Sequence, residues 1–236
     1  MFAKRILRRI IPENFRKVFR NFGILSEDYG QRKSISTWKW IDKEGNAIPW
    51  YTYPTIEYLV SLDFSGSKIL EFGSGASSIW WARRAESVLA VEHDKEWFAT
   101  SARNIVANLK IILAENESDY LVAATGGKFD VVIIDGIHRH RCAETVSDIL
   151  AADGLVILDN SDWHPETAKY LREKHDFLQV DFHGFGPINN YTWATSLFFS
   201  RTFLCRPSSA RLPSYAIGAL KLLADDQHPV AATARQ

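Results

Sequence analysis

The sequence predicts an α/β fold built on a doubly wound parallel sheet. From residue 67 onward, short apolar runs rich in β-branched residues alternate with segments of helical length. Apolar runs of this kind are typical of strands that are buried on both faces. The expected strands are 68–72, 87–92, 109–114, 129–135 and 154–159, and the expected helices lie near 77–85, 95–107, 116–125 and 139–151. Strands that alternate with helices in this way favour a parallel sheet with right-handed crossovers.

The end of this region follows a different pattern. Residues 177–184 and 195–204 are two further strand-like runs with no helix-length spacer between them. A parallel crossover needs a dozen or more residues, so we expect an antiparallel pair at one edge of the sheet. The chain then divides into an N-terminal arm (1–30), a cap segment (31–65), one α/β domain (66–205) and a peripheral C-terminal tail (206–236).

Composition restricts the class of protein. Apolar residues make up 46% and charged residues 24% of the 236 residues, which is ordinary for a soluble globular chain. Lys+Arg and Asp+Glu both number 28, so we expect no nucleic-acid partner. The two cysteines, Cys142 and Cys205, form no disulfide framework, which favours a reducing, cytoplasmic location. No apolar run approaches the roughly 20 residues that span a bilayer.

The N-terminal arm departs from this balance. Residues 1–22 carry seven Lys or Arg against one acid, Glu13, and apolar residues recur at helical spacing on either side of Pro12. Such a basic amphipathic segment fits peripheral contact with an anionic membrane, here the inner membrane surface. A helical arm docked on its own domain or on a second subunit, or a cleaved targeting peptide, would show the same pattern.

Ligands of open α/β sheets bind beyond the carboxyl ends of the strands. An acidic residue stands at or just after the end of every expected parallel strand: Glu71, Glu92, Glu115, Asp135 and Asp159. The first strand also leads into a glycine loop, Gly73-Ser74-Gly75, which lacks the third glycine of a dinucleotide motif. A ring of acids would repel a pyrophosphate, whereas S-adenosylmethionine carries a sulfonium and an ammonium and no phosphate.

We therefore expect S-adenosylmethionine as the cofactor. Glu71 would hold the ammonium side of its methionine moiety, and Glu92 would accept both ribose hydroxyls. Gly73 and Gly75 permit close approach of the backbone. Asn116 would approach the adenine amino group or cap a helix instead. The expected cofactor contacts are Glu71, Gly73, Ser74, Gly75, Glu92, His93, Asn116 and Asp135.

Four motifs carry a family resemblance: "LEFGSG", "VEHD", "FDVVIIDG" and "DGLVILDN". In this order and spacing they resemble the successive motifs of class I S-adenosylmethionine-dependent methyltransferases, over residues 66 to 203. The chain is also similar to a group of uncharacterised bacterial methyltransferase-like proteins. The resemblance implies a Rossmann-like, seven-stranded sheet whose last strand is antiparallel, and it implies that residues 66–205 are the methyltransferase domain.

The acceptor side is expected after the fourth and fifth parallel strands. Asp135, Asp159 and Asn160 form a hard oxygen set that suits Mg²⁺. The set is similar to that of catechol and macrolide sugar O-methyltransferases, but residues 137–140 replace the lysine base of the catechol enzymes. We therefore favour a metal-independent reaction slightly. Asp135 or a histidine, His138 or His140, would then take the proton. Arg139 would pair with Asp162 or grip an anionic substrate group.

Two aromatic segments, 48–59 and 182–193, are expected near the mouth of the cleft. The candidate acceptor contacts are Tyr51, Tyr53, Asp162, Phe185, Asn189 and Tyr191. A hydrophobic lid over the core is the alternative. The hypothesis is methylation of a hydroxyl on a small molecule or glycan. A nicotinamide-dependent oxidoreductase and a non-catalytic binding module are the alternatives, and nucleic-acid methylation is disfavoured because the Asn-Pro-Pro-Tyr type loop is missing.

Overall fold

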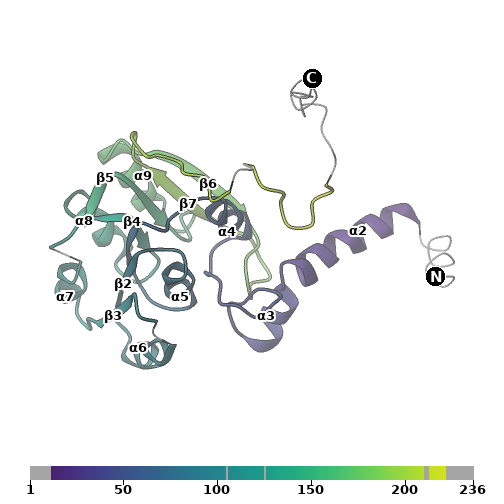
Figure 1. Ribbon diagram of the computed structural model, residues 1–236, viewed down its shortest axis with the longest axis horizontal. Helices are drawn as coiled ribbons and strands as arrows, with labels where there is room; N and C mark the ends of the chain where they lie inside the picture. Colours follow the sequence, from purple (N-terminus) through teal and green to yellow (C-terminus); the bar gives the residue numbers. More distant parts are fainter. Residues whose placement is uncertain (1–11, 105, 125, 210–212, 222–236) are drawn as a thin grey trace, which may run out of the picture.

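The computed structural model describes residues 12–104, 106–124, 126–209 and 213–221. A seven-stranded sheet with the order β3-β2-β1-β4-β5-β7-β6 forms its centre (Figure 1). The strands are β1 (Lys68–Phe72), β2 (Ser87–Glu92), β3 (Leu109–Leu113), β4 (Phe129–Ile134), β5 (Leu150–Leu158), β6 (Leu178–Gly184) and β7 (Trp193–Phe199). Strands β1 to β5 are parallel, and β7 pairs antiparallel with both β5 and β6. The predicted seven-stranded sheet with an antiparallel last strand is confirmed.

Both faces of the sheet are covered, which is why its central strands are almost entirely apolar. On one face, Ile69, Ile133 and Ile157 pack in one hydrophobic cluster with α4 (Tyr53–Val60) and α5 (Ala76–Ala82). On the other face, Leu70 and Val132 pack in a second cluster with α7 (Glu117–Val122), α8 (Arg139–Ile149) and α9 (Pro165–Lys174). The alternation along each strand thus sends successive side chains into different cores.

The expected element boundaries hold closely for the first two strands and fail at β5. That strand begins at Leu150, where the sequence pattern predicts a helix up to residue 151. Leu150 pairs with Phe129 of β4, and this pair adds residues to the N-terminal end of β5. The register between the two strands shifts between Phe129 and Val131. Helix α6 (Lys95–Ser101), after β2, is short and continues into the 3₁₀ turn η2 (Ala102–Asn104).

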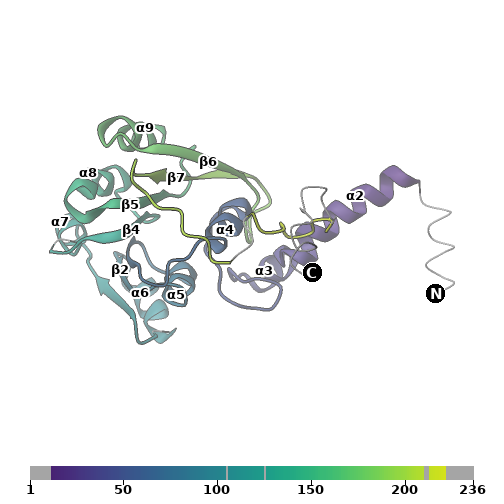
Figure 2. The same cartoon turned by 45° about the horizontal axis from the view of Figure 1, so that its top comes forward.

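The N-terminal region precedes the sheet as a series of helices. These are α2 (Glu13–Gly23), the π-helical turn η1 (Ile24–Asp28) and α3 (Gln31–Thr37), followed by a loop into α4. Helix α2 extends away from the sheet domain in both views (Figures 1 and 2) and buries none of its side chains. The part of the arm at residues 1–11 lies outside the described residues, as does the tail after residue 221.

The described part of the C-terminal tail returns to the N-terminal region. The backbone N–H of Asp63 donates to Arg206 O (2.8 Å), and Ile217 N donates to Glu57 Oε2 (3.1 Å). Further along, Arg20 Nη2 donates to Gly218 O (3.2 Å), which brings the tail beside α2. Among the described residues, no helix is both long and apolar enough to cross a membrane.

Candidate functional site

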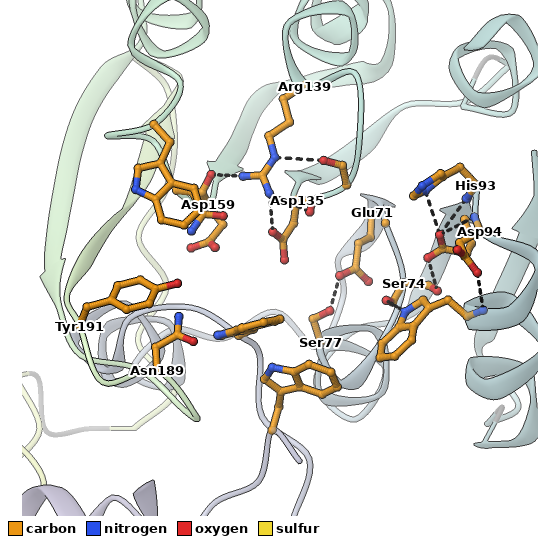
Figure 3. A pocket seen from close by; sticks show the side chains of 18 residues that line it. Glu71, Ser74, Ser77, His93, Asp94, Asp135, Arg139, Asp159, Asn189 and Tyr191 are labelled. Atoms are coloured by element: carbon orange, nitrogen blue, oxygen red, sulfur yellow. Dashed lines mark hydrogen bonds and ion pairs between the residues drawn. The ribbon is translucent and has the colours of Figure 1, made fainter. Parts of the chain in front are cut away.

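A cavity of about 570 Å³ opens at the carboxyl ends of the parallel strands (Figure 3). Its volume lies in the usual range for small-molecule sites. Strand ends β1 and β2 form one part of the wall, and strand ends β4 and β5 form the other. The loop between α3 and α4 and the β6–β7 connection complete it with aromatic residues.

The glycine loop and Glu71 lie at the end of β1. Glu71 is 1% exposed, and its carboxylate accepts hydrogen bonds from the hydroxyls of Ser77 and Ser78, with 2.5 Å between Glu71 Oε2 and Ser78 Oγ. Burial raises the pKa of Glu71 to about 8, although the two serine hydroxyls lower it in part. Among the described residues, no Lys or Arg pairs with this buried carboxyl group. A positively charged ligand would favour its ionised form.

Gly73 has a conformation that glycine adopts readily, with a φ of 122°. A Cβ atom there would come within 3.3 Å of the backbone nitrogen of Gly136, so the loop after β1 and the loop after β4 are in close contact. Gly75 lies at the start of α5, and its N–H donates to Ser78 Oγ (3.1 Å). Because glycine has no side chain, the backbone of this loop borders the cavity directly.

Glu92 ends β2 and is 3% exposed. Its Oε1 accepts from the backbone N–H groups of His93 (2.8 Å) and Asp94 (2.9 Å), and its Oε2 accepts from Ser74 Oγ (2.8 Å). These donors are all neutral and fix the carboxylate in one orientation. A carboxylate held in one orientation at this point can accept hydrogen bonds from two neighbouring hydroxyls of a ligand.

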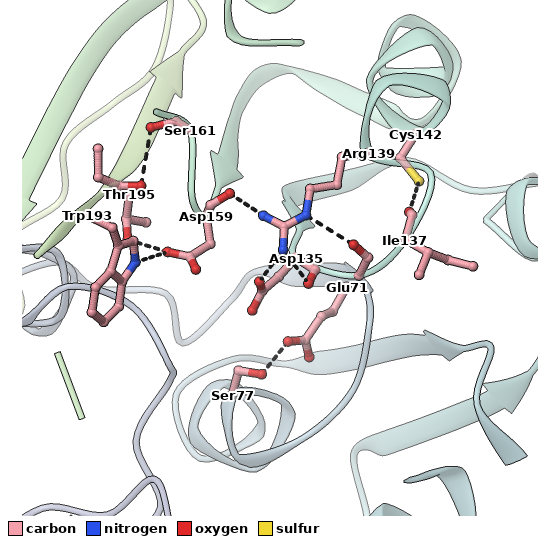
Figure 4. A network of polar contacts seen from close by, with 12 residues as sticks. Glu71, Ser77, Asp135, Ile137, Arg139, Cys142, Asp159, Ser161, Trp193 and Thr195 are labelled. Atoms are coloured by element: carbon pink, nitrogen blue, oxygen red, sulfur yellow. Dashed lines mark hydrogen bonds and ion pairs between the residues drawn. The ribbon is translucent and has the colours of Figure 1, made fainter. Parts of the chain in front are cut away.

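Arg139 dominates the other end of the cavity (Figure 4). From the first turn of α8, its guanidinium donates to Asp135 Oδ1 (3.2 Å) and to three backbone carbonyls, those of Asp135 (3.1 Å), Gly136 (3.0 Å) and Asp159. Asp159 Oδ1 accepts from Trp193 Nε1 (3.0 Å) and Thr195 Oγ1 (2.5 Å). The guanidinium thus joins the ends of β4 and β5.

The two aspartates titrate differently from free carboxyls. Burial raises the pKa of Asp135 to about 6, and the Arg139 guanidinium limits the rise. Burial, together with the negative charge of Asp135, raises the pKa of Asp159 well above its usual range. Asp135 is therefore ionised at neutral pH and ready to accept a proton.

The expected Mg²⁺ set does not fit this arrangement. Asp135, Asp159 and Asn160 all line the cavity, but the Arg139 guanidinium supplies a positive charge between the two strand ends. Asp159 Oδ1 already has two donors, and Asn160 sits in a left-handed turn with a φ of 50°.

Several expected contacts lie away from the cavity. Tyr51 and Tyr53 are buried in the hydrophobic core, whereas Trp50 of the same segment lines the cavity. Asn116 caps α7, where its Oδ1 accepts from Asp119 N (2.9 Å). His138 does not line the cavity, and its Nδ1 lies 3.7 Å from Glu117 Oε2 at the surface.

Asp162 and Phe185 also have structural contacts. Asp162 Oδ1 accepts from Ala194 N (3.1 Å), and the carbonyl of Phe185 accepts from Tyr53 N (2.7 Å). Neither residue lines the cavity. Asn189 and Tyr191 do line it, as do Glu71, Gly73, Ser74, Glu92, His93, Asp135, Arg139, Asp159 and Asn160. Gly75 borders a side hollow of about 60 Å³.

Four tryptophans of the cavity wall are not among the expected contacts, although segment 48–59, expected near the mouth of the cleft, contains one of them. They are Trp40 and Trp50 from the loop before α4, Trp97 from α6, and Trp163 from the turn after β5. Single tryptophans carry no periodic signal, and their burial in the core is the common outcome. A signal for Trp97 and Trp163 was their position, since each follows the end of a parallel strand by a few residues.

Comparison with known proteins identifies the fold. The sequence matches no family profile and no curated protein. Among solved structures, a precorrin-6y C5,15-methyltransferase from Geobacter metallireducens superposes with a TM-score of 0.51 at 13% identity, over 61% of this chain and 87% of that chain. The chain has the fold of class I S-adenosylmethionine-dependent methyltransferases.

Other similar structures share this fold at lower scores. An rRNA methylase from Streptococcus thermophilus has a TM-score of 0.49 at 13% identity, over 61% of this chain and 93% of that chain. TYW2 from M. jannaschii in complex with AdoMet has a TM-score of 0.45 at 17% identity, over 67% and 79%. The chain spans only 44% of the length of Trm5b from Pyrococcus abyssi, a further match.

One expectation about partners is overturned by these matches. The balanced charge led us to expect no nucleic-acid partner, yet structures of the same methyltransferase fold include a protein that acts as an rRNA methylase. Net charge averages over the whole chain and does not describe the surface around one cavity. Nucleic acid therefore belongs among the acceptor classes to be tested.

Proposed function

We propose that this protein is an S-adenosylmethionine-dependent methyltransferase that methylates a hydroxyl group of a small molecule or glycan. The observation that carries the proposal is the single cavity that joins two sets of groups. One set, around Glu71 and Glu92, suits a cationic nucleoside. The other set, around Asp135 and Arg139, suits the activation of an acceptor.

The residues present fit the cofactor. Gly73 and Gly75 leave the loop free of side chains where a ligand must approach. Glu92 offers two oxygens in a fixed orientation, and Glu71 is a buried carboxyl without a cationic partner. When bound, S-adenosylmethionine supplies an electrophilic methyl group and its own leaving group. The protein's task is then to position and deprotonate the acceptor.

Asp135 is the group placed to take the acceptor's proton. Asp135 lines the cavity, and its Oδ1 accepts from Arg139 Nη2, so Oδ2 would be the oxygen that accepts a proton from a substrate hydroxyl. A pKa of about 6 keeps this carboxylate ionised at neutral pH. Arg139 holds Asp135 in place and balances its charge. Asn189 and Tyr191, on the β6–β7 connection, are placed to hydrogen-bond an acceptor from the opposite wall.

The topology argues against the oxidoreductase alternative. Dinucleotide-binding domains have the parallel strand order 3-2-1-4-5-6, whereas this sheet inserts an antiparallel β7 between β5 and β6. The acids at the strand ends would also repel a pyrophosphate. A non-catalytic binding module would share the cofactor site, so only turnover separates it from an enzyme.

Calorimetric titration of the wild-type protein with S-adenosylmethionine, S-adenosylhomocysteine and NAD⁺ tests the cofactor. We expect the first two to bind and NAD⁺ to show no heat of binding. Acceptor classes are then compared by the formation of S-adenosylhomocysteine with simple glycosides, catechols and a short RNA. Turnover with the RNA alone would refute the proposed acceptor, and binding without turnover of any acceptor would support the binding module.

We also propose that α2 contacts an anionic membrane surface. Phe15, Val18, Phe19 and Phe22 of this helix are each more than half exposed, and Arg16, Lys17 and Arg20 flank them. The hydrogen bond from Arg20 to Gly218 O places exposed Ile217 and Leu220 of the tail near the same helix. Basic amphipathic helices of this kind lie in the membrane interface.

Sedimentation with vesicles tests the membrane contact. The wild-type protein should sediment with vesicles that contain phosphatidylserine at low salt and should not sediment with purely zwitterionic vesicles. A Phe19→Glu/Phe22→Glu variant should lose sedimentation and keep its cofactor affinity, because the cavity lies on another part of the fold. Absence of wild-type sedimentation would refute the contact, and a dimer in analytical ultracentrifugation would then identify a second copy as the occupant.

A further inference from the structure

Three indole rings meet above the glycine loop. Trp40 and Trp50 belong to the loop between α3 and α4, and Trp97 belongs to α6. The ring centroid of Trp40 lies 5.0 Å from that of Trp50 and 5.5 Å from that of Trp97, which it meets edge-on at 85°. Segments almost 60 residues apart in the chain thus join at the mouth of the cofactor end.

These rings are fixed in position. Trp97 Nε1 donates to Ser74 O (2.6 Å), which ties the ring directly to the glycine loop. A Cβ atom on Gly75 would lie 3.7 Å from the same ring. The loop that bears Trp40 is held by the hydrogen bond from Ile48 N to Trp40 O (3.0 Å). These contacts hold the indole rings in fixed positions at the edge of the cavity.

The space beside them is suited to a small cation. A hollow of about 60 Å³ is bordered by the three indoles, the glycine loop and Asp135. The main cavity adds Glu71 at the same end. Indole faces attract cations, and tryptophan does so best among the aromatic side chains. Trp40 Nε1 is buried and has no hydrogen-bond partner among the described residues.

We propose that Trp40, Trp50 and Trp97 form an aromatic cage for the sulfonium of S-adenosylmethionine. This inference rests on the proposed function. The product, S-adenosylhomocysteine, has the same ammonium, carboxylate and nucleoside, but its sulfur is neutral. A cage of this kind holds the cofactor more tightly than the product, so it favours product release after methyl transfer.

The ratio of two dissociation constants tests the cage. Calorimetry should show tighter binding of S-adenosylmethionine than of S-adenosylhomocysteine to the wild-type protein. Trp40→Leu should reduce this preference by roughly fivefold to thirtyfold, the range expected for a cation–π contact. Glu71 and Asp135 remain in this variant, so the change in the ratio reports the ring alone. Trp38→Leu is the matched control, because Trp38 lies two residues earlier and is 70% exposed.

The possible results distinguish failure of the cage proposal from failure of the proposed function. Equal affinities for the two ligands in the wild-type protein would overturn the cage and leave the proposed function standing. An unchanged ratio in Trp40→Leu would also overturn it. If Trp40→Leu does not fold, Trp50→Leu provides the same comparison at a half-exposed ring. If neither ligand binds the wild-type protein, the proposed function fails together with the cage.

Discussion

The two ends of the cavity hold their buried carboxylates by different means. At the cofactor end, Glu71 and Glu92 accept hydrogen bonds from serine hydroxyls and backbone N–H groups, and the ring of His93 lies 3.1 Å from Glu92 Oε1. At the acceptor end, Asp135 and the carbonyl of Asp159 accept from the guanidinium of Arg139. The strand ends are otherwise alike, since each acid lies at or just after the carboxyl end of a buried parallel strand.

This difference separates two kinds of chemistry. Neutral donors orient these carboxyl groups, and a cationic ligand would favour the ionised form of Glu71, whose pKa is raised by burial. At the acceptor end, the guanidinium of Arg139 balances the charge of Asp135 and lies between the ends of β4 and β5. This end therefore already contains a cation. The predictions below test this contrast, beginning with the largest expected effect.

Removal of the guanidinium should have the greatest effect on stability. Arg139→Met removes the ion pair with Asp135, whose two side chains are partly exposed, and three hydrogen bonds to backbone carbonyls at the ends of β4 and β5. Each charge-assisted hydrogen bond contributes about 1.5–3 kcal/mol, so we expect a loss of at least about 1.5 kcal/mol. Arg141→Met is the control, because Arg141 forms exposed ion pairs with Glu117 and Glu144 that contribute less than about 1 kcal/mol. Urea unfolding followed by circular dichroism measures both. Equal losses would show that Arg139 has no special role.

Loss of the charge on Glu92 should weaken the cofactor end alone. Glu92→Gln keeps the shape of the side chain but removes charge-assisted hydrogen bonds to the ligand, each worth roughly 1.5–3 kcal/mol. We therefore expect S-adenosylhomocysteine affinity to fall at least about tenfold in calorimetry. Glu86→Gln, at the other end of β2, should bind as the wild type does. If both variants kept full affinity, Glu92 would not be a ligand contact.

The sequence predicted the cofactor end far better than the acceptor end. The apolar runs 68–72 and 87–92 became β1 and β2 without change, because buried parallel strands leave an uninterrupted pattern. Their terminal acids and glycines follow directly from that register. The position of these residues needed only local information and the rule that ligands bind beyond the carboxyl ends of the strands.

The acceptor end depends on contacts between distant segments. No local pattern shows that Arg139 would reach the carbonyl of Asp159, twenty residues later, or that Thr195 and Trp193 would occupy an oxygen of Asp159. The aromatic run 48–59 likewise gave no means of deciding which rings face the core. Tyr51 became buried, and its neighbour Trp50 lines the cavity.

The uncompensated carboxyl of Glu71 should make stability depend on pH. Its pKa is raised from 4.5 to about 8 in the folded protein. The folded state therefore keeps a proton that the unfolded state releases, and this stabilisation is lost as the pH rises from about 4.5 to 8. The expected slope is at most about 1.4 kcal/mol per pH unit. Unfolding free energies of Glu71→Gln between pH 5 and 8 should lack this decline. Parallel curves for the variant and the wild type would contradict it.

Divalent metal should have the smallest effect. The Arg139 guanidinium occupies the acceptor end. We therefore expect that neither EDTA nor added Mg²⁺ changes the melting temperature or the S-adenosylhomocysteine affinity. Titration with Mn²⁺, followed by electron paramagnetic resonance, should detect no bound ion in the wild type. Stoichiometric Mn²⁺ binding that Asp135→Asn abolishes would show that the metal site exists after all.

A crystal structure of the complex with S-adenosylhomocysteine tests the central claim most directly. The account predicts that both ribose hydroxyls donate to the carboxylate of Glu92 and that the methionine end lies over Gly73 and Gly75, beneath Trp40. The sulfur atom should then face Asp135 across the open cavity. Density for the ligand elsewhere, or a ribose held by residues other than Glu92, would contradict the assignment of the cofactor end.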